Sequence, residues 1–443
     1  MDAAQLQSLQ PALEQWLEGF EPCFKRAASF AHFQSYLLGL MTDLRRKSVE
    51  PIALAAGSAV RTLQEFLSFF KWDHQRLDRL LLQGVANRRV QGGIGVIDAT
   101  SHLKRGDKTP GVAPQYCGET GKVDNCVLAQ HLLFTDNDPV NPFSCVLASD
   151  LYLPRDWDQD RARCAAAGID ERLVYRPKWQ VALEQVRGAL ASGVKLKWAV
   201  FDEDYGRIPA FWFELDRLGQ EAVGEVPASF HAWVKRPACR SSQACHASRR
   251  IDHLAAHSPA FTAQAWKRFV VKQTTRRPLQ WEYKAARVHL VDCSGNGKTH
   301  HAGVPTDRRY WLIVMRQPDT GEIKYVISNS SENASAEELI RVLLSRWHVE
   351  KWFERAKQET GLGAFEVRTY TSLIRHWLCV RVAMCFLAEQ TARLRGEKSA
   401  DHLRAGRRSG CNPGRQNLAA RLAVLVEPAE TLRLSPASQC GRI

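Results

Sequence analysis

Two aspartates follow short apolar runs of strand-like length. Residues 92–97 lead into Asp98, and residues 196–201 lead into Asp202. The C-terminal ends of strands are where side chains emerge into the functional crevice of a sheet, so the two acids are predicted to share a site. Carboxylates that converge in this way are ligands for hard divalent cations. The pair therefore indicates a metal site.

A third acid, Glu350, lies in a predicted helix over residues 346–357. Arg346 lies four residues before Glu350, and Lys357 lies seven residues after it. At 3.6 residues per turn, these offsets put all three side chains on one face of the helix. Three convergent carboxylates can hold two divalent cations about 3.5–4 Å apart, one activating a hydroxyl nucleophile and the other stabilising the leaving oxygen of a phosphodiester. Basic neighbours would then hold the phosphate backbone.

Each of these residues also has a purely structural interpretation. An aspartate at a strand end often forms a turn or caps a helix, and an Arg/Glu/Lys helix face is often solvated. Two further acids compete, Asp204 and Glu354. Asp202 is preferred over Asp204 because the Tyr-Gly pair that follows indicates a turn. The offsets of the neighbouring cations favour Glu350 over Glu354.

The elements that must position these acids have the predicted order β-β-β-α-β. A hairpin over residues 310–328 follows, and one long helix is predicted from Ser335 past Lys357, with Ser335 and Glu338 spaced as a capping box. Such a core, an insertion and a helix bearing Glu350 make one coherent α/β architecture. The five core segments are residues 92–98, 125–129, 143–147, 179–186 and 196–202.

The chain divides into a helical N-terminal part, a catalytic core with an insertion, and a helical C-terminal part. Apolar residues at three- and four-residue spacings predict helices in the first ninety residues, whose basic segments suit DNA contacts or an ordinary solvated face. No helix-turn-helix is identified. The predicted division is 1–90, helical and DNA-binding; 91–215, first part of the core; 216–308, basic insertion; 309–370, second part of the core; and 371–443, C-terminal helices and tail.

Composition and charge agree with a soluble protein that binds a polyanion. Of 443 residues, 45% are hydrophobic and 24% charged, which excludes disordered and collagen-like chains. The net charge is +14, and residues 229–311 hold fifteen Lys/Arg against four acids. Phosphates are the expected partner, with a solvated basic surface as the alternative. No leader and no run of about 18 apolar residues are found, so a cytoplasmic protein outside the membrane is expected.

The cysteines and the tryptophans of the insertion have open interpretations. Twelve cysteines are too few for a disulfide scaffold and are expected to be free thiols. A zinc site is a minor possibility, and its ligands would be Cys239, Cys245, His253 and His257. In the insertion, Arg276 and Arg277 are predicted to grip DNA. Four tryptophans could stack on unpaired bases or form a small core, namely Trp233, Trp266, Trp281 and Trp311.

The chain resembles the DDE transposases of bacterial insertion sequences, in particular the family marked by a DDE superfamily endonuclease domain, whose catalytic core is RNase H-like. The resemblance covers most of residues 30–380, and its matching segments occur in order along the chain. These segments are residues 95–106, 111–126, 151–157, 202–206 and 346–357 with Gly361-Leu362 after them.

The resemblance implies that Asp98, Asp202 and Glu350 form the catalytic triad of acids and bind two Mg²⁺ or Mn²⁺ ions. Arg346 and Lys357 match the arginine and lysine of the related transposase signature and are expected to contact DNA. The implied activity is hydrolysis of a phosphodiester at the transposon end by metal-activated water, followed by attack of the freed 3′ hydroxyl on target DNA.

Other implied features concern DNA contacts and assembly. Lys104 and Arg105 are expected to bind DNA, and the partners are double-stranded terminal repeats and target DNA, bound by a homodimer or higher oligomer. The chain departs from the family pattern at Leu343, where a tyrosine is usual, and at Ser101 and His102. Neither departure removes a metal ligand. The alternatives are a catalytically silent DNA-binding protein derived from a transposase and an RNase H-like structure-specific nuclease.

Overall fold

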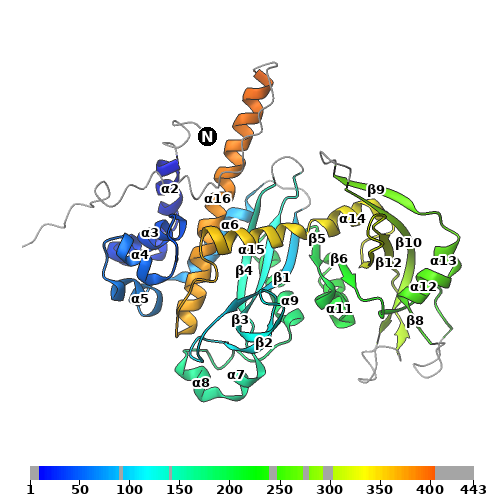
Figure 1. Ribbon diagram of the computed structural model, residues 1–443, viewed down its shortest axis with the longest axis horizontal. Coiled ribbons are helices and arrows are strands. Elements are labelled where there is room, and N and C mark those ends of the chain that lie inside the picture. The colour runs from blue at the N-terminus through cyan, green and yellow to red at the C-terminus, as the bar shows by residue number, and fades with distance from the viewer. Residues whose placement is uncertain are drawn as a thin grey trace, which may run out of the picture.

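The computed structural model describes residues 9–88, 93–138, 142–238, 247–272, 279–292 and 303–404. A large mixed sheet forms the middle and right of the molecule in Figure 1, with the N-terminal helices and the long C-terminal helix gathered at the left. One continuous hydrophobic core joins these helices to the sheet. The protein is therefore a mixed α/β structure with N-terminal and C-terminal helices, as predicted.

The core sheet has the strand order β4-β3-β1-β5-β6. β3 runs antiparallel to both of its neighbours, whereas β1, β5 and β6 are parallel. All ten residues of β3 from Cys126 onward are buried, as expected of a strand covered on both faces. This arrangement is consistent with the predicted RNase H-like core. The bounds are β1 Ile94–Leu103, β3 Lys122–Thr135, β4 Ser144–Leu151, β5 Trp198–Phe201 and β6 Glu221–Val226.

β1 does not end at Asp98, as the sequence predicted. It continues to Leu103, because β3 pairs with it along its whole length, from Ile94 opposite Thr135 to Leu103 opposite Cys126. The shorter strand β2 (Ala113–Cys117) pairs with the first part of β3. Asp98 is thus in the middle of a long strand.

The sheet continues beyond β6, first through the predicted hairpin and then through strands of the predicted insertion. β13 pairs antiparallel with β6, and β12 and β13 form the predicted hairpin. Its turn contains Gly321, whose positive φ of 74° suits glycine. β10 then joins β12 to the outer strands. The bounds are β7 His231–Trp233, β8 Arg249–Arg250, β9 Lys267–Lys272, β10 Leu279–Asp292, β11 Val304–Pro305, β12 Tyr310–Arg316 and β13 Ile323–Ser328.

The N-terminal region is helical, as predicted, and packs around the long helix α16 (Tyr370–Arg404). Trp72 stacks on Phe66, with ring centroids 5.3 Å apart and an interplanar angle of 6°. Arg375 of α16 donates hydrogen bonds to the carbonyls of both residues. The helices are α2 Leu9–Glu18, η1 Glu21–Cys23, α3 Ala27–Met41, α4 Val49–Ala55, α5 Val60–Ser68 and α6 His74–Ala86.

α16 is a core helix that joins the N-terminal helices to the sheet. Its part Tyr370–Leu394 is long and apolar enough to cross a membrane, the one such helix among the described residues, yet 83% of its apolar window is buried inside the protein. Arg381 donates to the carbonyl of Val146 in β4 (3.0 Å), and His376 contacts the hydroxyl of Tyr36 in α3 (2.8 Å). These buried polar contacts hold both neighbours against α16.

Successive residues of β3 show which helices cover each face of the sheet. Gln130 accepts the Tyr205 hydroxyl of α10 (Glu203–Gly206) at 2.5 Å, and His131 packs on Phe353 of α15 (Trp347–Glu359), with ring centroids 5.1 Å apart. Successive side chains of a strand point to opposite faces, so α10 and α15 cover different faces. The other helices are α7 Arg155–Gln159, α8 Arg161–Ala166, α9 Lys178–Ala191, α11 Pro209–Arg217, α12 Ile251–His257 and α13 Pro259–Thr262.

The single helix predicted from Ser335 past Lys357 is wrong, because two helices replace it. α14 (Ala336–Leu344) starts as expected, with the Ser335 hydroxyl accepting the N–H of Glu338 at 3.0 Å. At Ser345 the backbone changes to i→i−3 hydrogen bonds, and the serine hydroxyl donates to the carbonyl of Val342 (2.6 Å). Such a side-chain bond competes with the helical ladder. A second helix, α15, therefore begins immediately before Glu350.

Candidate active site

Asp98 and Asp202 are brought level by the register of parallel strands β1 and β5. Val96 is the partner of Val200, and the same register continued by two residues puts Asp98 opposite Asp202. β5 ends at Phe201, so Asp202 begins the segment that turns away from the sheet. Both acids therefore lie where β5 has ended and β1 continues.

Asp98 points to the face of the sheet that α15 covers. It is the cross-strand partner of His131, and paired residues share a face. Its carboxylate lies 4.0 Å from the guanidinium of Arg346, and its side chain is 18% exposed. Its Oδ1 also accepts the N–H of Ala99 (2.7 Å). Asp98 is thus a nearly buried acid with one cationic neighbour.

Asp202 combines a place beside Asp98 with a capping role. Its side chain accepts the N–H of Asp204 (3.0 Å) as the N-cap of α10, so the structural interpretation of a strand-end aspartate also applies. Asp204 itself forms an ion pair with Lys178 (3.5 Å) and is 58% exposed. The geometry therefore separates the two aspartates, with Asp202 towards Asp98 and Asp204 towards α9.

Glu350 lies in the first turn of α15 and is bound by Arg346. The two side chains are 2.8 Å apart, the i,i+4 relation expected from their spacing, and the Glu350 side chain is 52% exposed. Glu354, the competing acid, pairs with Lys351 (2.5 Å) instead. Arg346 therefore bridges Asp98 and Glu350, which are far apart in the sequence.

The charges of these acids interact. Burial, and then the charge of Asp202, raises the pKa of Asp98 to about 7, while the Ala99 N–H and Arg346 act in the opposite direction. Burial and the nearby charge of Asp204 raise the pKa of Asp202. Burial of Arg346 is outweighed by Glu350, Asp98 and other acids, so the pKa of its guanidinium is raised. The charges of Asp98, Asp202, Glu350 and Arg346 thus act on one another.

In the described part of the chain, no group of three or more His, Cys, Asp or Glu side chains is arranged to hold a metal ion. The convergence that two bridging ions require is thus not reached in this structure, in which Arg346 lies against Asp98 and Glu350. The donor chemistry does fit, since carboxylate oxygens are the ligands that Mg²⁺ and Mn²⁺ prefer. Burial and the charge of Asp202 raise the pKa of Asp98, and a bound cation would favour its ionised form.

The predicted DNA-contacting lysines have different surroundings. Lys357 donates to the carbonyl of Ser101 in β1 (3.3 Å) and lies 3.8 Å from Glu119. Lys104 is largely buried, and its ammonium group donates to the carbonyls of Gly363 (2.8 Å) and Phe365 (2.7 Å). Its exposed neighbour Arg105 makes no such contact with the described residues. Lys104 therefore stabilises the fold, whereas the Arg105 side chain is exposed and can contact a ligand.

Several predicted residues are not part of this site. Arg276, Arg277, Cys239 and Cys245 lie outside the described residues. His253 and His257 share a face of α12, with ring centroids 4.5 Å apart. Two of the four tryptophans of the insertion are buried and belong to its core, Trp233 and Trp281.

Sequence reasoning missed the residues that support the two aspartates. Gln130 donates to the backbone carbonyl of Asp98 (3.1 Å) and accepts from Tyr205, three residues after Asp202. The Gln130 side chain thus links the backbone of Asp98 to the helix that Asp202 caps. Gly206 is also required, because a Cβ there would lie 1.9 Å from the carbonyl oxygen of Glu225. The Tyr-Gly pair was the available signal, and it indicated only a turn.

The order of the core strands and the flanking helices are consistent with an RNase H-like fold. The chain belongs to the DDE superfamily endonucleases, whose family model matches residues 19–289. That segment includes Asp98 and Asp202 and ends before Glu350. The match therefore does not extend to α15, the helix that carries Glu350.

One relative is a protein from Microchaete diplosiphon described as a probable transposase for insertion sequence element IS701. It is 28% identical to this chain over 199 residues, which are 44% of this chain and 48% of the relative. The match thus spans about half the length of that curated relative.

Proposed function

We propose that the protein is the transposase of a bacterial insertion sequence. The observation that supports this most strongly is that Arg346 forms ion pairs with both Asp98 and Glu350, while the charge of Asp202 acts on Asp98. Acids from three separate elements of an RNase H-like core thus interact. A protein that only binds DNA has no use for three acids beside a phosphate backbone. The family of DDE endonucleases and the resemblance to a probable transposase support the same assignment.

In this proposal, Asp98, Asp202 and Glu350 hold Mg²⁺ or Mn²⁺, which when bound activates water and stabilises the leaving oxygen. Arg346 releases the carboxylates and turns to the phosphate, a role that its fork of donors suits. Water forms a bond to phosphorus at the transposon end while the bond to the 3′ oxygen breaks. The freed 3′ hydroxyl then attacks a target phosphodiester, displacing its 3′ oxygen.

The substrates proposed are the terminal repeats of the element and the target duplex, bound by a homodimer or higher oligomer in the bacterial cytoplasm. Gln130 and Tyr205 hold Asp98 and Asp202 in position beside each other during both steps. Arg105 and Lys357 lie on the side of the site where the phosphate backbone would continue. The domain division predicted from the sequence is proposed as the functional division too.

The experiment is cleavage and joining of labelled duplexes that carry the element's own ends, with Mg²⁺, with Mn²⁺ and with chelator. Asp98→Asn, Asp202→Asn and Glu350→Gln should each lower both activities by orders of magnitude. DNA affinity should change little, since it comes mostly from phosphate contacts. Asp204→Asn and Glu354→Gln are matched controls and should remain active.

Two results would favour the alternatives. A wild-type protein that cuts branched or hairpin DNA but never joins ends would be a structure-specific nuclease. A wild-type protein that binds the ends and neither cuts nor joins with any divalent metal would be a silent DNA-binding protein. Equal activity of the Asp204→Asn and Asp98→Asn variants would reject the assignment of the acids.

A further inference from the structure

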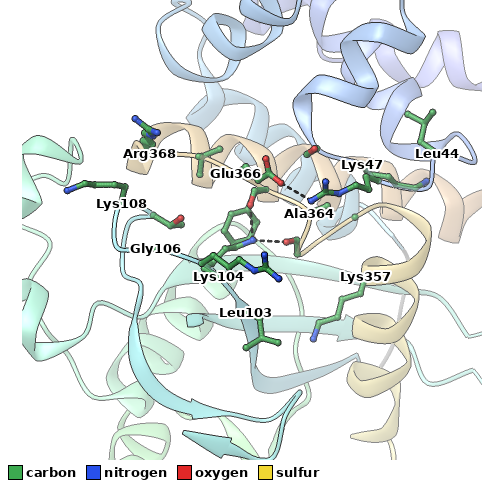
Figure 2. A pocket seen from close by; sticks show the side chains of 18 of the residues that line it. Leu44, Lys47, Leu103, Lys104, Gly106, Lys108, Lys357, Ala364, Glu366 and Arg368 are labelled. Atoms are coloured by element: carbon green, nitrogen blue, oxygen red, sulfur yellow. Dashed lines mark hydrogen bonds and ion pairs between the residues drawn. The ribbon is translucent and has the colours of Figure 1, made fainter. Parts of the chain in front are cut away.

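A cleft of about 910 Å³ lies beside the candidate active site. Three segments line it: residues 44–48 between α3 and α4, residues 103–109 after β1, and residues 357–368 at the end of α15 and beyond. Figure 2 shows Lys104 and Lys357 pointing into this space from different elements. The cleft thus forms where the N-terminal helices meet the catalytic core.

Buried lysines hold the walls of the cleft in place. Lys47 is 7% exposed and donates to the carbonyls of Leu40 (2.8 Å) in α3 and Glu359 (2.7 Å) in α15. Lys104 ties the end of β1 to Gly363 and lies over the ring of Phe365, 3.6 Å from its centroid. Burial lowers the pKa of each lysine to about 8. Because these bonds join all three segments, the cleft is formed before any ligand arrives.

The exposed charges of the cleft are predominantly positive. Arg45, Arg105 and Arg368 are exposed, and none of them makes an ion pair with any residue in the described ranges. The two acids that line the cleft are Asp107 and Glu366, both already next to a cation of the cleft wall. Three arginines from three segments therefore face solvent around one concave surface, without an ion-pair partner among the described residues.

The chemistry of the lining favours phosphate over bases. The aromatic residue of the cleft, Phe365, is 2% exposed and covered by Lys104, so it offers no free ring face. Surfaces that bind unpaired bases use exposed aromatic rings, whereas arginines without such rings contact phosphates. The ligand that fits is the sugar–phosphate backbone of a duplex.

The cleft also has the right position for DNA that enters the active site. Lys357 lines it and lies two helical turns from Glu350, roughly 10 Å along α15 at 1.5 Å per residue. A backbone held in the cleft would continue along α15 to the carboxylates.

We infer that this cleft binds the phosphate backbone of duplex DNA next to the scissile phosphate, and that Arg45, Arg105 and Arg368 are its main contacts. This inference rests on the proposed function, because it assigns the DNA path of that site. It places the main DNA contact between the N-terminal helices and the core, outside the basic insertion.

The test compares a triple variant, Arg45→Ala, Arg105→Ala and Arg368→Ala, with a control that loses the same charge, Arg187→Ala, Lys195→Ala and Arg217→Ala. The control residues are Arg187 on α9, Arg217 at the end of α11 and Lys195 in the segment between α9 and β5, and none of them lines the cleft. Binding of a labelled duplex is measured by anisotropy from about 50 to 300 mM salt. All six residues are on the surface, so both variants should fold, which circular dichroism verifies.

The cleft variant should bind both an end duplex and a random duplex on the order of 100-fold more weakly at about 0.1 M salt. The reason is that each lost phosphate contact reduces the slope of log K against log salt concentration by roughly 0.9. The control should keep the wild-type slope. Replacement of the same three arginines by lysine should restore most of the slope, since the charge is retained.

An unchanged slope in the cleft variant, or an equal loss in the control, would overturn the inference. Binding and cutting are separate measurements, so the two proposals can fail separately. If the wild type binds through the cleft but never cuts DNA, the proposed function fails and the cleft assignment stands. If it cuts and joins normally with the cleft variant at full affinity, the cleft assignment fails alone.

Discussion

Asp98 lies level with Asp202 on neighbouring parallel strands, although Asp98 is in the middle of β1 and Asp202 follows the last residue of β5. The difference arises because β3 supports β1 beyond the point where β5 ends. Beyond Val96, β1 therefore has no partner on the side of β5 among the described residues. Arg346, at the start of α15, contacts Asp98 in this part of β1. The position of the site follows from this unequal strand length.

Arg346 should stabilise the protein most when no divalent metal is present. Arg346→Gln removes the cation that bridges Asp98 and Glu350 and should lower the free energy of unfolding by about 1–3 kcal/mol at pH 8 in chelator. Saturating Mg²⁺ should reduce this deficit, because it supplies positive charge to the same carboxylates. Thermal unfolding with and without metal measures both effects.

The control for this variant is Lys351→Gln, which breaks an exposed ion pair with Glu354 on the same helix. Such pairs contribute little, about 0–1 kcal/mol, and the change should not depend on metal. A deficit of Arg346→Gln that is identical with and without Mg²⁺ would separate the arginine from the metal site.

Asp98 should make the metal-free protein less stable as the pH rises. Its pKa is about 7 in the folded protein against a reference of 3.8, so the folded state holds the proton more tightly. The ionised carboxylate therefore costs stability above about pH 4, and the cost grows until about pH 7. Asp98→Asn should be more stable than wild type by at most about 4 kcal/mol at pH 8, with no difference below pH 4. Urea unfolding across this range measures the difference.

The outcome against this expectation is a constant difference at all pH values, which would assign the effect to packing. Asp204→Asn provides the comparison, because Asp204 is mostly exposed and paired with Lys178. It should change stability by less than about 1 kcal/mol at any of these pH values.

Gly206 should be essential for the packing of α10 on the sheet. Gly206→Ala would put a Cβ 1.9 Å from the backbone oxygen of Glu225, so α10 must move and take Asp202 with it. A loss of about 1–3 kcal/mol is expected, together with lower activity. Gly188→Ala, in α9 with no atom within 4 Å of the new Cβ, should be neutral or slightly stabilising. Equal stability of the two variants would contradict the described contact.

Much of the fold could be predicted because its signals are local. Apolar runs of strand length marked β1, β4 and β5, and the Ser335 cap marked the start of α14. The end of β1 could not be predicted, since it depends on pairing with β3, whose full length the apolar run at residues 125–129 did not indicate. The break at Ser345 was missed because a serine inside an apolar pattern carries little weight in a single sequence.

The sequence predicted which residues could form the site but not how they are arranged in three dimensions. The offsets of Arg346 and Glu350 on one helix predicted their contact, which the structure has at 2.8 Å. The support from Gln130 and Tyr205 depends on two strands and a short helix that meet only in three dimensions. The cleft likewise combines segments whose sequence separation hides their common surface.

Asp98, Asp202 and Glu350 are proposed to bind the catalytic metal together. The most direct measurement is the anomalous scattering of Mn²⁺ in crystals of the protein bound to a duplex that carries the element's end. We expect Mn²⁺ in direct contact with all three carboxylates, with Arg346 turned away from Glu350. Mn²⁺ bound elsewhere, or bound to the aspartates while Glu350 remains on Arg346, would contradict it.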